Sequence, residues 1–163
     1  MIADYFLDTN VFVYSFDERE PAKAERARGL IEQGLVEGCG CTSWQVVQEF
    51  VNVALHKWEK PMSAQSAQVY VRQTLAPLCR VMPSPRLWEQ AMQLHETTQF
   101  RWYDSLIVAA ALESGALSNP YRFVRRWLDR RPQLTLRQVD PIIRQLTLYR
   151  DLIDGKTKEN TPE

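Results

Sequence analysis

One segment, residues 103–114, constrains the fold of this chain most, because a helix formed there has almost no polar side. Its uncharged apolar run, residues 106–112, is far too short to span a bilayer. Other parts of the protein must therefore cover this helix on most sides. Gly115 follows at the position where a glycine commonly ends a helix.

Short segments with strand character alternate with longer segments of helical spacing along the first two thirds of the chain. This alternation predicts an α/β fold in which helices cover both faces of a parallel sheet. We expect strands at residues 2–7, 39–42 and 78–82, and helices that begin near Pro21, Ser43, Ser63 and Pro85. On the last of these helices the spacing directs five apolar side chains inward: Leu87, Trp88, Ala91, Met92 and Leu94.

Charge is distributed unevenly along the chain. Residues 1–115 carry a net charge of −4, whereas residues 116–150 carry eight arginines against Asp129 and Asp140, a net charge of +6. A basic segment on an acidic body favours binding of a polyanion there, although an ordinary solvated helix face has the same composition. We expect one domain over residues 1–150 and a polar, disordered tail over residues 151–163.

The three cysteines, Cys39, Cys41 and Cys79, cannot all pair, and their spacing fits neither a zinc knuckle nor a thioredoxin-type motif. Free thiols in a reducing compartment are the simplest interpretation. The N-terminus also has no basic stretch followed by an apolar stretch of the kind that forms a signal peptide. Together these features predict a cytoplasmic protein without a membrane span.

Three acidic residues stand out by their positions. Asp8 ends the first expected strand, where open parallel sheets place their ligand crevice. Glu49 lies on the polar face of the helix after Ser43, together with Gln45, and Asp104 lies in the first turn of the apolar helix. Each has an ordinary alternative, since Asp8 could cap a turn, Glu49 could be solvated and Asp104 could cap its helix.

Carboxylates gathered in one pocket repel each other and stay ionised only beside a compensating cation. Mg²⁺ and Mn²⁺ prefer oxygen ligands, and a water bound to such an ion can attack a phosphodiester. His56 and His95 stand in no metal or catalytic-triad motif. The acids therefore predict metal-dependent hydrolysis.

Three stretches of the sequence resemble the acidic motifs of VapC-type PIN domains: residues 6–11 (FLDTNV), 48–53 (QEFVNV) and 102–111 (WYDSLIVAAA). Residues 17–23 are similar to the segment that follows the first motif in that family. The resemblance covers about residues 1–115. It implies a PIN-like three-layer fold, Mg²⁺ or Mn²⁺ as cofactor, and cleavage of RNA by the toxin of a toxin–antitoxin pair.

By this resemblance Asp8, Glu49 and Asp104 are the catalytic, metal-binding residues, and Asn10 supports the pocket. Arg101, beside Asp104, is the candidate to offset the repulsion between an acidic pocket and RNA. The resemblance also implies a cognate antitoxin and a homodimer. We therefore expect exposed apolar side chains on the helices between residues 63 and 94, for instance Trp88 or Tyr70.

The sequence departs from the family pattern after the apolar helix. The family commonly has a fourth acid there, but residues 121–123 contain none, and Asp129 and Asp140 come later. Weak metal binding is therefore expected, and a PIN-like protein that binds RNA or a protein partner without cleavage is the main alternative. A phosphatase with an aspartyl nucleophile is less favoured, because Asn10 stands where such enzymes usually have their second acid.

Overall fold

The computed structural model of the protein describes residues 3–116, apart from the side chains of residues 97 and 98. The chain divides into two units, Met1–Leu117 and Ser118–Glu163, and the described residues belong to the first. The predicted basic segment and polar tail lie outside the described residues. The predicted single domain over residues 1–150 thus stays a prediction.

Three short parallel strands form the sheet, in the order β1-β2-β3. They are β1 (Tyr5–Phe6), β2 (Gly40–Ser43) and β3 (Cys79–Val81). All three lie within or next to the predicted segments, although β1 is shorter than predicted. The pairing of the first segment nevertheless extends beyond β1, because the backbone N–H of Leu7 donates to the carbonyl of Cys41 over 2.8 Å.

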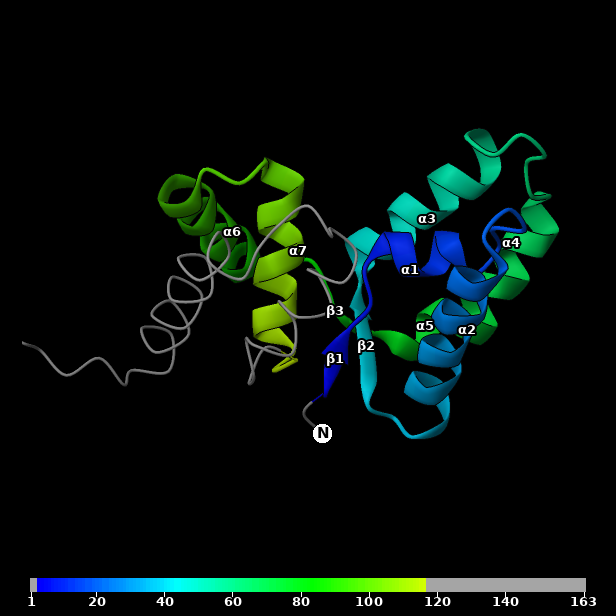
Figure 1. Ribbon diagram of the computed structural model, residues 1–163. Coiled ribbons are helices and arrows are strands. Elements are labelled where there is room, and N and C mark those ends of the chain that lie inside the picture. Colours follow the sequence, from blue (N-terminus) through cyan, green and yellow to red (C-terminus); the bar gives the residue numbers. More distant parts are fainter. Residues whose placement is uncertain (1–2, 117–163) are drawn as a thin grey trace, which may run out of the picture. The chain divides into compact units, whose positions relative to one another are not determined.

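Helices lie on both sides of the strands, with α6 and α7 on one side and α1 to α5 on the other (Figure 1). This arrangement confirms the predicted α/β fold of three layers. The helical elements are α1 (Thr9–Tyr14), α2 (Pro21–Val36), α3 (Trp44–His56), α4 (Ala64–Tyr70), the π-helical turn η1 (Val71–Leu75), α5 (Ala76–Leu78), α6 (Pro85–Thr98) and α7 (Trp102–Glu113).

Serine side chains start three of the helices as the sequence predicted. Ser43, Ser63 and Ser84 each accept a hydrogen bond from the backbone N–H three residues further on, at the beginnings of α3, α4 and α6. Gly115 follows α7 with a φ of 77°, which explains why a glycine stands there. Local chemistry therefore fixes the helix boundaries around the sheet.

Two of the five side chains predicted to face inward on the helix that begins near Pro85 are exposed instead. Trp88 and Met92 are 51% and 57% exposed, whereas Leu87, Ala91 and Leu94 are buried as predicted. Gln90 takes the remaining buried position on α6. Among the described side chains, the buried face of α6 is therefore narrower than the apolar pattern.

The backbones of α2 and β2 approach each other closely at two glycines. A Cβ atom on Gly40 would lie 2.8 Å from the Cα of Gly34 and 3.0 Å from Cε2 of Tyr5. Backbone atoms cannot give way as a flexible side chain can, so a methyl group here forces α2 away from the sheet. Gly29, also on α2, has no atom within 4 Å of an added Cβ.

We predict that Gly40→Ala lowers the free energy of unfolding by about 1–3 kcal/mol, the usual cost of overpacking. Gly29→Ala is the matched control and should raise it by about 0.5–1 kcal/mol, because alanine is the better helix former. Urea denaturation of the two variants checks both. Equal stability of Gly40→Ala and the unchanged protein would contradict the close approach.

Candidate active site

Asp8 lies just beyond β1 and begins α1. Its Oδ1 accepts a hydrogen bond of 3.1 Å from the backbone N–H of Val11, so the carboxylate is the N-cap of α1. The alternative interpretation of Asp8 as a local cap is thus confirmed. It does not exclude metal binding, because a carboxylate has about four lone-pair sites and one cap occupies only one of them.

Glu49 is a half-buried residue of α3 whose two carboxylate oxygens are both engaged. Oε2 accepts a hydrogen bond from Thr9 Oγ1 over 2.6 Å, and Oε1 accepts one from Gln45 Nε2 over 2.8 Å. The alternative of a solvated surface glutamate is therefore wrong. Each oxygen keeps capacity for a further ligand.

Thr9 links the segment of Asp8 to Glu49 by a hydrogen bond. It follows Asp8 directly in the chain and bonds to Glu49, which lies 40 residues further on. Beneath this contact the rings of Phe12 on α1 and Phe50 on α3 meet edge to face, with their centroids 6.3 Å apart. Both phenylalanines are fully buried, so the packing of α1 on α3 supports the hydrogen bond between Thr9 and Glu49.

The aromatic contact between α1 and α3 continues into a larger cluster. Phe16, Trp58 and Tyr70 join Phe50, with ring centroids 4.9 to 6.1 Å apart. Burial raises the pKa of the Tyr70 hydroxyl. The helices α1 and α3 thus pack around one continuous cluster of aromatic side chains.

Asp104 is the third residue of α7, and its side chain is exposed. Arg101 occupies the N-cap position, so the alternative that Asp104 caps the helix is wrong. A carboxylate in the first turn is favoured by the helix dipole. In Figure 1 the first turn of α7 lies at the same end of the sheet as the carboxyl end of β1.

Within residues 3–116, no group of three or more His, Cys, Asp and Glu side chains is placed so that it could hold a metal ion. The structure thus joins Glu49 to Thr9, the chain neighbour of Asp8, while the convergence of the three carboxylates stays a prediction. The chemistry of the donors fits a hard divalent cation, since carboxylate oxygens supported by hydroxyl and amide donors are its preferred ligands.

Both residues predicted to contact RNA are exposed next to a predicted acidic ligand. Asn10 is the second residue of α1, and Arg101 precedes α7. Their roles stay predictions. Thr9 and Gln45 received no role from the sequence, although the signal was present: one adjoins Asp8, and the other lies one helical turn before Glu49.

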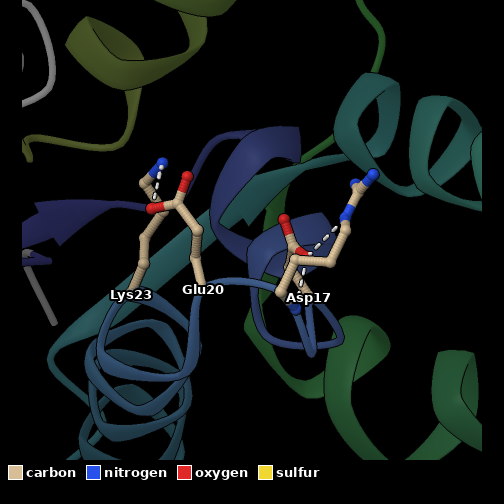
Figure 2. A network of polar contacts seen from close by, with 4 residues as sticks. Asp17, Glu20 and Lys23 are labelled. Atoms are coloured by element: carbon tan, nitrogen blue, oxygen red, sulfur yellow. Dashed lines mark hydrogen bonds and ion pairs between the residues drawn. The ribbon is translucent and has the colours of Figure 1, made fainter.

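The segment between α1 and α2 is held by two ion pairs, which Figure 2 shows side by side. Asp17 accepts from Arg19 over 3.2 Å, and Glu20 pairs with Lys23 over 3.3 Å. Hydrogen bonds from Arg19, first its backbone N–H and then its side chain, lower the pKa of the Asp17 carboxyl. These acids therefore have local cationic partners and order the turn.

Residues 5–126 match the sequence profile of the PIN domain. The chain belongs to the PIN-domain family. This match spans all three acidic motifs and extends past the residues that the structure describes. PIN domains are commonly metal-dependent nucleases and bind RNA. No curated protein matches the chain.

Across residues 3–116, none of the helices of this PIN domain combines the length and the apolar character that crossing a membrane requires. Even α7, its most apolar helix, spans only Trp102–Glu113 and carries Asp104 in its first turn. Its middle is instead buried within the protein, at Val108, Ala109, Ala110 and Ala111.

Asp8 contributes a hydrogen-bond acceptor that caps α1 and also a negative charge. Two substitutions distinguish these contributions. We predict that Asp8→Ala lowers the free energy of unfolding by about 1 kcal/mol through loss of the cap, whereas Asp8→Asn keeps a capping oxygen and leaves it nearly unchanged. Thermal unfolding of both variants provides the measurement. If both variants lose the same stability, the cap is not what Asp8 contributes.

Proposed function

We propose that this PIN-domain protein is a metal-dependent endoribonuclease that hydrolyses RNA phosphodiester bonds, and that it is the toxin of a toxin–antitoxin pair. The observation that carries the nuclease proposal is the contact of Thr9 with Glu49, which joins the first two acidic motifs at the end of β1. Carboxylate oxygens of this kind are ligands that a hard divalent cation prefers.

Asp8, Glu49 and Asp104 are the residues that would hold Mg²⁺ or Mn²⁺. When bound, the ion supplies positive charge and activates a water toward phosphorus. Thr9 and Gln45 each donate a hydrogen bond to the Glu49 carboxylate. We infer that the exposed amide of Asn10 donates to a phosphate oxygen beside Asp8.

We propose single-stranded or looped RNA as the substrate, because the phosphodiester of a folded duplex is hard to bring into a small acidic site. An acidic site repels phosphate, so cationic groups at its rim must compensate. Arg101 is the described candidate, as an exposed guanidinium three residues before Asp104. The arginines of residues 122–131 are further candidates and lie outside the described residues.

The toxin role rests on the resemblance of the three motifs to VapC-type proteins. A cognate antitoxin would block the acidic site, and a basic side chain suits that purpose by charge. A cytoplasmic location follows from the proposed RNA substrate and from the free cysteines, of which Cys41 is buried.

A homodimer is supported by the surface of α6. Trp88 and Met92 lie one helical turn apart and are both more than half exposed, and Met82 just before the helix is 54% exposed. Large apolar side chains grouped on one surface commonly mark an interface. The other residue expected on that surface, Tyr70, is only half-exposed and belongs to the aromatic cluster.

A PIN-domain protein that binds RNA or a partner without cleavage is the second candidate. It is supported by the absence of a three-acid metal cluster within residues 3–116 and by the lack of an acid at residues 121–123. With fewer carboxylates, the site supplies less charge to a cation that gives up its waters reluctantly. This candidate predicts RNA binding without turnover.

We predict that Asp8→Asn and Glu49→Gln each abolish Mn²⁺-dependent cleavage of single-stranded RNA while the protein stays folded. Each removes one anionic ligand without a change in size. Asp129→Asn, outside the described residues, is the control and should leave Mn²⁺ affinity unchanged. RNA cleavage that survives Asp8→Asn, or that proceeds equally in EDTA, would contradict the proposed mechanism.

We predict that Trp88→Glu converts a dimer into a monomer, because a charge at the centre of an apolar contact is not compensated. Val36→Glu serves as the control, since Val36 is also exposed but lies on α2. Light scattering at high protein concentration distinguishes the two variants. A monomeric unchanged protein at the same concentration would rule out the dimer.

A further inference from the structure

The residue that precedes Glu49 by one turn of α3 has a defined contact and no assigned role. Gln45 is half-buried, and its Nε2 donates to Oε1 of Glu49 over 2.8 Å. We propose that Gln45 is a positioning residue, which together with Thr9 holds the Glu49 carboxylate in the orientation needed to bind a divalent cation. This inference rests on the metal-dependent function proposed above.

The geometry at Glu49 fixes the carboxylate from two elements at once. Thr9 reaches Oε2 from α1, and Gln45 reaches Oε1 from within α3. One donor on each oxygen prevents rotation of the carboxylate and still leaves a lone pair on each oxygen. A carboxylate oriented before the cation arrives loses less freedom when it binds.

Another glutamine–glutamate hydrogen bond in this protein lies on an exposed helix surface and differs from the one between Gln45 and Glu49. Gln33 on α2 donates to Oε2 of Glu37 over 3.0 Å with the same spacing of four residues, but both side chains are exposed. Such a pair contributes little to the stability of a helix. The hydroxyl from a second element and the partial burial distinguish Gln45 and Glu49 from it.

The chemistry of the donors matters as much as their placement. Thr9 and Gln45 are neutral, so they orient Glu49 without cancelling its charge. Between residues 3 and 116 the ion pairs involve Asp17 and Glu20, and none involves Glu49. A lysine or arginine at position 45 would compete with the cation for the same carboxylate. A neutral amide leaves the full negative charge available.

The test measures Mn²⁺ affinity by calorimetry on the full chain. Gln45→Met keeps the length of the side chain and removes the donor, and we expect it to weaken Mn²⁺ binding about ten- to a hundredfold, the usual effect of losing a partner of a metal ligand. Gln33→Met is the matched control and should bind as the unchanged protein does. If Gln45→Met does not fold, Gln45→Ala replaces it.

A second pair of variants tests the other donor. Thr9→Val removes the hydroxyl at constant shape and should weaken Mn²⁺ binding, whereas Thr9→Ser restores the donor and should rescue it. In RNA cleavage, the loss in Gln45→Met should be recovered at high Mn²⁺ concentration. A merely structural role for Gln45 would not produce that recovery.

The outcomes separate this inference from the function on which it rests. If Asp8→Asn abolishes Mn²⁺ binding while Gln45→Met leaves it unchanged, the positioning role is wrong and the metal-dependent function stands. If Asp8→Asn and Glu49→Gln also bind Mn²⁺ as the unchanged protein does, the metal site itself is wrong and the inference falls with it.

Discussion

The packing of α1 against α3 is the contact on which the candidate site depends. Phe12 and Phe50 are fully buried and meet at the centre of this contact. Thr9 lies one turn before Phe12 on α1, and Glu49 directly precedes Phe50 on α3. The hydrophobic contact therefore sets the distance between the two polar residues, and their hydrogen bond follows from it.

The carboxylate of Asp8 has an observed role as a helix cap and a proposed role as a metal ligand. Its carboxylate caps α1 and so fixes the start of the helix that carries Thr9. The same carboxylate stands at the end of β1, where the proposed cation would bind. The two roles are compatible because the hydrogen bond of the cap uses only one of about four lone-pair sites of a carboxylate.

Local sequence signals predicted most helix starts correctly. They were less reliable for positions where several elements pack together. Serine caps are short-range chemistry, so Ser43, Ser63 and Ser84 were read correctly from the sequence. The helix α1 was missed because its six residues, TNVFVY, are rich in β-branched and aromatic types. Helical spacing predicted that Trp88 faces inward, whereas the resemblance predicted that it is exposed, and the structure agrees with the second prediction. Apolar spacing alone cannot tell a residue that faces the core from one beside it.

The sequence by itself determined the α/β class, the positions of the three strands and of the longer helices along the chain, and the three acidic motifs typical of a PIN domain, because these depend on residue type and spacing along the chain. Only the tertiary structure decided that Glu49 is held by Thr9 and Gln45, that α2 meets β2 at two glycines, and that Trp88 faces outward. The physical reason is that each of these is set by how separate elements pack, and periodicity within one element does not contain that information.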